Sequence, residues 1–311
     1  MLVARIIDSH VHLYPAEVSG NPATWAASRS ETHWGKLVSP RNGRPSLQGW
    51  ADIDDLLREM DRSGVDRAVL QGWYWEHQET CDWQNQYYAT CMKAHPDRIS
   101  AFATVKPSAG KAALDAIRRA REDGFSGLGE LCPRIQGGAL SDPEWVEAMT
   151  LAAECELVVL FHVDEQVGRD HAGRMRTAPE DFQWIAEACP NLRIILAHFG
   201  GGLVFHRLNR GVKKVFDRIW FDTAASPLLY DSAVYGAAIA CGVGDRLLFG
   251  SDFPLITRPR RSSLPAGGYD WGRPEMGSHL NEIRGSGLSD SDLSRILAGN
   301  AADLLGLHLG T

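Results

Sequence analysis

Short apolar runs alternate with amphipathic stretches along the chain, and this alternation recurs about eight times. The apolar runs are rich in β-branched residues and five to eight residues long, which predicts buried strands. The expected strands span residues 3–8, 66–70, 98–105, 125–131, 157–163, 192–198, 218–223 and 246–251. The stretches between them repeat apolar residues with a helical period, most clearly over 51–63, 111–122, 142–155, 178–188 and 231–241.

Strands that are apolar throughout and are followed by helices predict a parallel sheet covered on both faces. Eight such units favour an α/β fold of the (β/α)8 TIM-barrel type, as one domain over residues 1–311. An open doubly wound sheet is the alternative, but no Gly-rich phosphate-binding turn follows the first strand. Two connections are long, 14–50 after the first strand and 253–287 after the eighth. In a barrel both would lie at the carboxyl ends of the strands, where loops form active sites.

Composition narrows the range of partners. The net charge is −7, with both signs interspersed and no basic stripe, so we expect no nucleic-acid partner. No apolar run reaches the roughly 20 residues of a membrane helix, so no membrane partner is expected either. The six cysteines are scattered and no signal-peptide pattern opens the chain, which predicts reduced thiols and a cytoplasmic protein. Whether the chain forms a homo-oligomer is left open.

Two histidines, His10 and His12, stand one residue apart at the end of the first apolar run. Alternate residues of a strand point to the same side, so the two imidazoles would make half of a site for a first-row metal. On its own the pair is weak evidence, because polar residues also end strands that bind nothing.

Further candidate ligands stand at the ends of other strands. His162 ends the fifth expected strand and His198 the sixth, while Glu130 lies in the fourth and Asp252 follows the eighth. In a parallel barrel these ends converge on one rim. Each residue alone could be an ordinary buried polar group, but the whole set favours a site for Zn²⁺ or another divalent ion.

The chain resembles the amidohydrolase superfamily in motifs that follow one another in the superfamily's order: "DSHVHLYP", "LFHV", "ILAHFGGG", "LLFGSDFP" and "ILAGNAADLLGL". The likeness runs from about residue 5 to residue 307 and is stronger to the amidohydrolase-related branch, which includes aminocarboxymuconate-semialdehyde decarboxylase and ring-opening hydrolases. It implies that His10, His12 and His162 bind a metal. It implies that Asp252 also binds the metal and takes a proton from its bound water. For His198 it implies a catalytic acid or base beside one metal, or a ligand where there are two.

Glu130 corresponds to a position where some branches place a carboxylate or a carboxylated lysine between two metals. No lysine stands there, so a carboxylated-lysine bridge is set aside. Glu130 could bind one ion, bridge two, or act as a base near the substrate, and a carboxylate held by loop amides is the structural alternative. The expected cofactor is therefore one divalent ion per chain, or two, with zinc as the first expectation.

Two reactions fit such a site. Our first hypothesis is hydrolysis of a C–N or C–O acyl bond (amide, lactam, lactone or ester) in a small ring-containing molecule, by a metal-activated water. The presence of Glu130 at the fourth strand favours this reaction. The alternative is metal-dependent, non-oxidative decarboxylation of an unsaturated or aromatic carboxylic acid, which the family resemblance also implies. A metal-stabilised barrel that only binds a ligand is the third reading.

Candidate substrate contacts come from the loops. The segment "GWYWEH" follows the second strand and should line the mouth of the barrel, so Trp73 and Trp75 are expected to contact an aromatic substrate. These indoles could equally pack the first long loop against the barrel. Arg134, after the fourth strand, and Arg169, after the fifth, are candidates to hold a substrate carboxylate.

Overall fold

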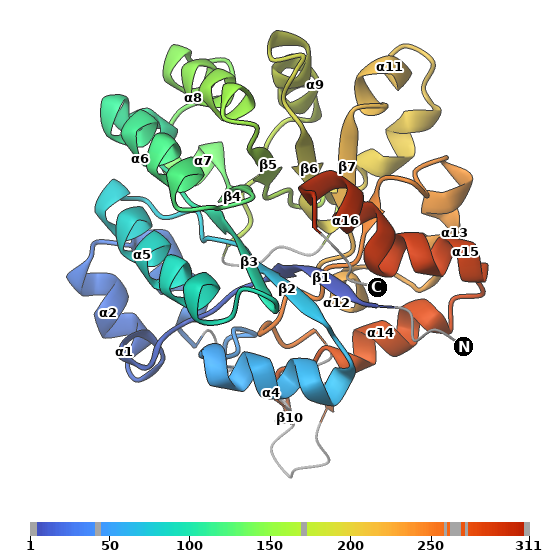
Figure 1. Cartoon of the computed structure of the whole chain (residues 1–311), viewed down its shortest axis with the longest axis horizontal. Coiled ribbons are helices and arrows are strands. Elements are labelled where there is room, and N and C mark those ends of the chain that lie inside the picture. The colour runs from blue at the N-terminus through green and yellow to red at the C-terminus, as the bar shows by residue number, and fades with distance from the viewer. Residues whose placement is uncertain are drawn as a thin grey trace.

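A computed structural model describes residues 5–40, 45–168, 173–257, 260–261, 269–270 and 273–307. Eight parallel strands follow one another in chain order inside a ring of helices (Figure 1). They are β1 (Ile7–Val11), β2 (Arg67–Leu70), β3 (Ile99–Ala103), β4 (Gly127–Leu131), β5 (Val158–Phe161), β6 (Ile194–Leu196), β7 (Ile219–Asp222) and β8 (Leu247–Leu248). The ring closes where Ser9 N–H donates to the Phe249 carbonyl at 2.8 Å and His12 N–H to the Phe253 carbonyl at 2.7 Å. The fold is the single-domain (β/α)8 barrel that the sequence predicts.

The outer helices alternate with the strands. They are α4 (Ile53–Ser63), α5 (Gln78–Ala94), α6 (Lys111–Glu122), α8 (Pro143–Glu154), α9 (Pro179–Ala188), α11 (Lys213–Phe216), α13 (Ala233–Ala240) and α14 (Gly277–Arg284). Shorter helices lie in the connections: α1 (Ala16–Ser19), α2 (Pro22–Ser28), α3 (Thr32–Val38), α7 (Pro133–Gln136), α10 (Ala197–Gly201) and α12 (Ser226–Leu229). The chain ends with α15 (Asp290–Ser294) and α16 (Asn300–Leu305), joined by a π-helical turn. Among the described residues, no helix combines the length and apolar character needed to cross a membrane.

Local sequence sets the limits of α4, the first long helix. The side chain of Asp52 accepts the backbone N–H of Asp55 at 2.9 Å, and the Asp55 side chain accepts that of Asp52 in return. This reciprocal pair satisfies two of the N–H groups that a helix start leaves without partners. Gly64, with φ of 73°, ends the helix in the left-handed conformation that glycine adopts without strain. Leu56 and Met60 bury one face of the helix against the barrel.

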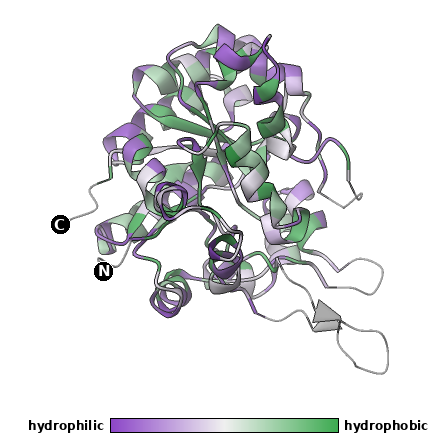
Figure 2. Ribbon diagram, turned by 90° about the vertical axis from the view of Figure 1, so that its right-hand side faces the viewer, coloured by the Kyte–Doolittle hydropathy of each residue, from purple (hydrophilic) through white to green (hydrophobic). Residues whose placement is uncertain are grey.

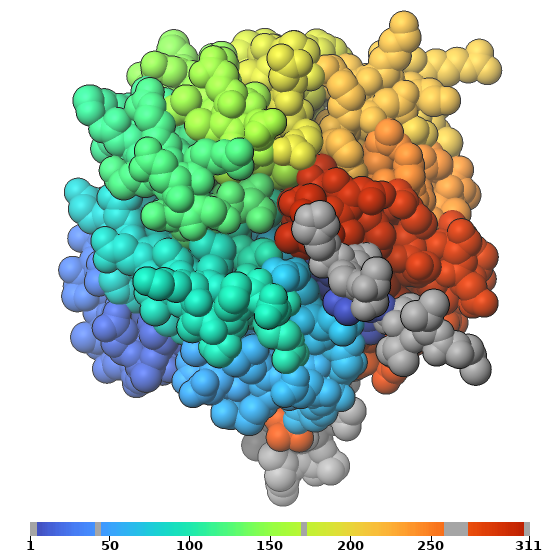
Figure 3. Space-filling view, viewed as in Figure 1, coloured from blue at the N-terminus to red at the C-terminus, as the bar shows by residue number. Residues whose placement is uncertain are grey.

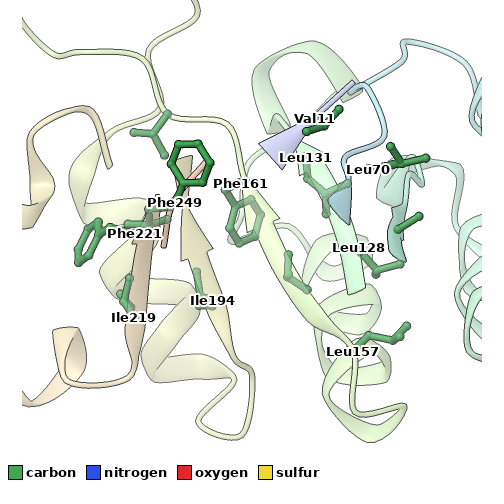
Figure 4. Packing of buried hydrophobic residues seen from close by; sticks show 14 of the residues in the cluster. Val11, Leu70, Leu128, Leu131, Leu157, Phe161, Ile194, Ile219, Phe221 and Phe249 are labelled. Carbon is green, nitrogen blue, oxygen red and sulfur yellow. The ribbon is translucent and has the colours of Figure 1, made fainter. Parts of the chain in front are cut away.

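Alternate residues of the strands divide between two apolar layers. One layer fills the inside of the barrel and contains Ile7, Val69, Phe102, Val158, Leu160, Ile195 and Leu248. The other layer packs the outside of the strands against the helices, and Figure 4 shows several of its members, among them Phe161, Ile194 and Phe221. Figure 2 accordingly shows mostly hydrophobic residues along the central strands, surrounded by helices of mixed character. Two apolar layers on the same strands explain why their sequences read as continuous apolar runs.

The C-terminal helices close the amino-terminal end of the barrel. Ala301 and Leu304 of α16 belong to the interior cluster. The guanidinium of Arg193, the residue before β6, donates to the Leu304 carbonyl at 2.9 Å and so fixes α16 at the start of the strands. In Figure 3 the red surface of this segment extends from the middle of the same face to its right-hand edge. With one end covered, the opposite, carboxyl end remains for a site.

The two long connections contain more regular structure than the sequence predicts. Residues 14–50 hold α1, α2 and α3, and residues 253–287 hold α14 and an antiparallel pair, β9 (Arg260–Arg261) and β10 (Tyr269–Asp270). Helices of four to eight residues show too few turns for a periodic pattern, so tertiary packing decides them. The strand ends also differ from the prediction. β6 stops at Leu196 and β8 at Leu248, because the following residues turn out of the ladder.

Candidate functional site

The carboxyl ends of the strands bring together every residue that the sequence analysis nominated as a ligand or catalytic group. Their potential ligand atoms form two groups, each within 4.8 Å: His10, His12 and Asp252, and Glu130, His162 and His198. Five of the six residues are buried, and His162 is nearly so. The convergence expected of a parallel barrel is therefore present.

Glu130 lies between the two groups. Its Oε1 atom is 2.8 Å from Nδ1 of His162, 3.6 Å from Nε2 of His198 and 3.9 Å from Nε2 of His10. Its Oε2 atom is 3.8 Å from Nε2 of His12. One carboxylate therefore faces all four imidazoles, a position from which it could bind one ion or bridge two.

Three of these imidazoles are held in the same way. In each ring Nδ1 lies within hydrogen-bonding distance of an oxygen, and Nε2 faces the shared space. The pairs are His10 with Oδ2 of Asp222 at 2.8 Å, His12 with the Gln71 carbonyl at 2.9 Å and His198 with the Ala224 carbonyl at 3.0 Å. A carbonyl or carboxylate oxygen can only accept, so one ring proton belongs on Nδ1. Nε2 then faces the site, with a lone pair in the neutral ring and with a second proton in the charged ring.

The resulting donor set fits a divalent ion. Nε2 of His10 and Nε2 of His12 are 3.2 Å apart, and Oδ1 of Asp252 is 3.5 Å from the latter. Two lone pairs that face each other at this distance repel unless a proton or a metal cation lies between them. Two nitrogens that share one ion at about 2.1 Å are roughly 3.0 to 3.4 Å apart, which is the spacing seen here. Imidazole nitrogen with carboxylate oxygen suits zinc and manganese alike.

Electrostatics in the site favour added positive charge. Burial lowers the pKa of His10, but the charges on Asp222 and Glu130 outweigh burial and raise it to about 9. Burial also lowers the pKa of His198, while its interaction with Glu130 raises it to about 10. Burial raises the pKa of Glu130, yet the charges on His162 and His10 hold it well below its usual value. The carboxylates thus leave a surplus of negative potential among the imidazoles, which a divalent cation would neutralise.

The backbone is strained where it presents two of these side chains. His198 has φ of 58° and Asp252 has φ of 63°, in the left-handed region that costs a residue with a side chain about 1 kcal/mol or more. The turn after His198 continues left-handed through Gly200, Gly201 and Gly202. A Cβ atom on Gly201 would lie 2.4 Å from the Asp164 carbonyl oxygen, so glycine is required there for space as well as for conformation.

The two predicted tryptophans have different surroundings. The ring of Trp73 makes an edge contact with His12, with centroids 5.4 Å apart. Trp75 is fully buried, its indole N–H donates to Oε1 of Gln84 at 2.7 Å, and it packs against tryptophans of the first connection. Trp73 therefore lies beside the candidate ligand His12. Trp75 instead packs against the segment 14–50, which we call the lid. The lid and Trp75 form one aromatic cluster, with members that include Tyr14, Trp25, Trp34 and Trp75.

The predicted arginines do not join the described part of the site. Arg134 is exposed on α7, and Arg169 lies outside the described residues. The lid instead contacts the loops after β2 and β5 through α3. His33 N–H donates to Oε2 of Glu76 at 2.6 Å, and its ring nitrogen lies 3.2 Å from the Gly173 carbonyl in the loop after β5.

Sequence reasoning missed two neighbours of the candidate ligands. Tyr74 lies beside His162, with ring centroids 4.9 Å apart, and stacks on Trp73 at 4.3 Å. Asp222 holds His10 from the end of β7. The signal for Asp222 was present, because it ends the seventh apolar run just as the other site residues end theirs. Tyr74 gave no such signal, because it lies beyond the end of β2, where residues no longer alternate between the two sides of a strand.

Comparison with known proteins identifies the family. A family model described as amidohydrolase matches residues 7–307, whereas no curated protein matches the chain. Solved structures share the fold. The 5-carboxyvanillate decarboxylase of Sphingomonas paucimobilis is 17% identical, with a TM-score of 0.72 over 98% of this chain and 100% of that one. A dihydroxybenzoic acid decarboxylase of a Polaromonas species, with bound manganese and 2-nitroresorcinol, is 18% identical, with a TM-score of 0.67 over 98% of each chain.

A third structure has a different reaction. The probable 2-pyrone-4,6-dicarboxylic acid hydrolase of Acinetobacter baumannii, with citric acid bound, is 14% identical, with a TM-score of 0.61 over 97% of this chain and 100% of that one. Identities this low show a common fold and leave the substrate open. The resemblance inferred from the strand-end motifs is confirmed: the match over residues 7–307 shows that the chain belongs to the amidohydrolase family.

Proposed function

We propose that this protein is a metal-dependent, non-oxidative decarboxylase of a small aromatic carboxylic acid. The observation that carries the proposal is an imidazole, His198, whose Nε2 atom faces the Glu130 carboxylate in a donor set beside an aromatic wall. This was the alternative in the sequence analysis. Relatives with decarboxylase activity, one of them with manganese and a ring-containing inhibitor bound, now favour it over hydrolysis.

The metal would be held by His10, His12 and Asp252, with His162 and Glu130 as further ligands. A bound divalent ion would act as a Lewis acid on an oxygen of the substrate and hold that molecule in place. Both zinc, our first expectation, and manganese match the donor types. Elemental analysis of protein purified without chelators tests both the identity and the number of ions. Less than about 0.2 metal per chain with full activity would remove the metal from the proposal.

The chain's own residues supply the proton. When the bond between the ring carbon and the carboxylate breaks, carbon dioxide leaves and its bonding electrons stay on the ring carbon. That carbon then takes one proton, which we assign to Nε2 of His198. The Ala224 carbonyl fixes the direction of this ring, and water resupplies the proton after turnover.

The substrate ring would lie against Trp73 and Tyr74. These two rings stack on each other and touch His12 and His162, respectively, so they form a continuous aromatic surface next to the proposed ligands. Aromatic surfaces of this kind bind flat rings through dispersion and edge contacts. Arg169 stays a candidate for the substrate carboxylate, and Arg134, which is exposed, is a weaker one.

Hydrolysis of a ring-containing ester or lactone is the second candidate. The pKa values of Glu130 and Asp252 are held below their usual values despite burial, so both remain charged and either could accept a proton from water. The similarity to a pyrone dicarboxylic acid hydrolase supports the same reaction.

One experiment separates the two reactions. The metal-loaded protein is incubated in D₂O with hydroxylated benzoic acids and, separately, with pyrone carboxylic acids. Decarboxylation predicts carbon dioxide release and one deuterium at the vacated ring position, both of which disappear in His198→Asn. Ring opening without carbon dioxide release would instead support hydrolysis and overturn the proposal.

A further inference from the structure

The carboxylate of Asp222 hydrogen-bonds to one histidine of each group of candidate ligands, His10 and His198. Asp222 is fully buried at the end of β7, and the two oxygens of its carboxylate serve different histidines. We propose that Asp222 is the positioning residue that fixes His10 as a metal ligand and His198 as a proton donor at the same time. The inference rests on the metal site of the proposed function, but not on whether the reaction is decarboxylation or hydrolysis.

The first oxygen acts on His10. Oδ2 of Asp222 accepts from Nδ1 of His10 at 2.8 Å, and both side chains are shielded from solvent. This contact keeps the proton on Nδ1 and directs the Nε2 lone pair toward His12 and Asp252. A carboxylate behind a ligating imidazole also makes the ring a better electron donor to a metal. Nδ1 of His12 faces a backbone carbonyl, so of these two histidines it is His10 whose Nδ1 atom faces a carboxylate.

The second oxygen acts on His198. Oδ1 of Asp222 accepts the backbone N–H of His198 at 2.8 Å and that of Ala224 at 3.0 Å. These bonds tie the strained left-handed turn at His198 to the end of β7. The Ala224 carbonyl then holds Nδ1 of His198 at 3.0 Å. The residues just after Asp222 and the Asp222 carboxylate therefore fix both the backbone and the ring of His198.

An asparagine cannot replace this double contact. Its amide has one accepting oxygen and one donating nitrogen, whereas Asp222 faces donors on both sides. If the oxygen keeps the two backbone N–H groups, the amide nitrogen faces Nδ1 of His10 and drives the ring proton to Nε2. His10 then loses the lone pair that a metal needs. Because two hydrogen bonds outweigh one, we expect this orientation in Asp222→Asn.

The experiment titrates Co²⁺ into chelator-stripped full-length protein and follows its visible absorption. Asp222→Asn is expected to weaken Co²⁺ binding by about 10- to 100-fold and to change the absorption spectrum. Thr223→Val is the matched control. Thr223 is equally buried, follows Asp222, and exchanges hydrogen bonds with Gly250 without touching an imidazole. Equal Co²⁺ affinity and spectrum in Asp222→Asn and wild type, or equal losses in Asp222→Asn and Thr223→Val, would overturn the assignment to His10.

The contact with His198 is tested with Asp222→Ala at saturating metal. This variant removes the hydrogen bonds of Asp222 to both histidines. We expect kcat to fall by at least about tenfold beyond the loss in Thr223→Val, with KM changed less than threefold, because His198 is displaced while the aromatic wall stays. A kcat equal to that of Thr223→Val would overturn the link to His198. A wild-type enzyme that binds Co²⁺ and hydrolyses its substrate would contradict the proposed reaction and leave these outcomes intact.

Discussion

The two ends of this barrel use the same strands for different purposes. On β5, Val158 and Leu160 point into the barrel and pack in the interior cluster, and His162, next in the same alternation, reaches the site. On β7, Trp220 packs against the interior cluster, and two residues later the carboxylate of Asp222 hydrogen-bonds to Nδ1 of His10. The change from apolar to polar takes place within a single step of two residues along a strand.

Backbone conformation follows the same division. Among the described residues, four of the six non-glycine residues with positive φ lie beyond the carboxyl ends of β6, β7 and β8: His198, Phe199, Ala225 and Asp252. The other two, Ser30 and Glu156, lie in the segment 14–50 and just before β5. The amino-terminal end has the apolar contacts of α16. We therefore expect the apolar interior and α16 to sustain the strain and the charge at the carboxyl end. Variants at the two ends should therefore fail in different ways.

The largest effect is expected at the metal ligands. His12→Asn keeps a polar group of similar reach but removes an imidazole from the closest nitrogen pair of the site. We expect loss of bound metal and a fall in kcat/KM on the order of 10³-fold or more, with a melting temperature close to that of metal-stripped wild type. Elemental analysis and thermal unfolding measure both. Substantial activity without metal would contradict this view of the carboxyl end.

The second-largest effect is expected at His198, where activity should fall without loss of metal. His198→Asn should lower kcat by about 10²- to 10⁴-fold, the usual contribution of a general acid, while the metal content stays unchanged. Metal content and single-turnover rates give the two readouts. If the variant loses one of two bound ions, His198 is a ligand of a second metal and not the proton donor.

At the opposite end the loss should be one of stability. Leu304→Ala removes a buried side chain of α16 from the interior cluster and should lower the free energy of unfolding by about 2 to 5 kcal/mol. The kcat of the folded protein should change less than threefold. Urea unfolding and active-site titration test this. A tenfold loss of kcat with unchanged stability would erase the distinction between the two ends.

The smallest effect sharpens the difference between two neighbouring tryptophans. Trp75→Phe removes a buried hydrogen bond to Gln84 and should lower the free energy of unfolding by about 1 to 2 kcal/mol, with little change in KM. Trp73→Phe should mainly raise KM, since its ring contacts His12. Steady-state kinetics and thermal unfolding of both variants provide the comparison. A higher KM in Trp75→Phe would indicate that Trp75 contacts the substrate, as the sequence analysis expected.

Much of this architecture could be predicted from local pattern. The apolar runs gave the eight strands, and their ends gave the positions of His10, His162 and Asp252, because parallel strands in a barrel share one carboxyl rim. The pattern did not reveal the short lid helices, since α1, α2 and α3 are held by packing among aromatic residues far apart in the sequence. It also gave no reason to prefer Tyr74 over Trp75 at the site.

The sequence by itself determined the barrel, the rim and the types of candidate ligand gathered there, because periodicity and residue chemistry are local properties. Only the tertiary structure decided which nitrogen of each imidazole faces the site. That choice depends on a partner such as Asp222, which lies 212 positions from His10 in the chain and 2.8 Å from it in space. Hydrogen-bond partners of this kind are fixed by the closure of the barrel, and no segment of the chain contains them on its own.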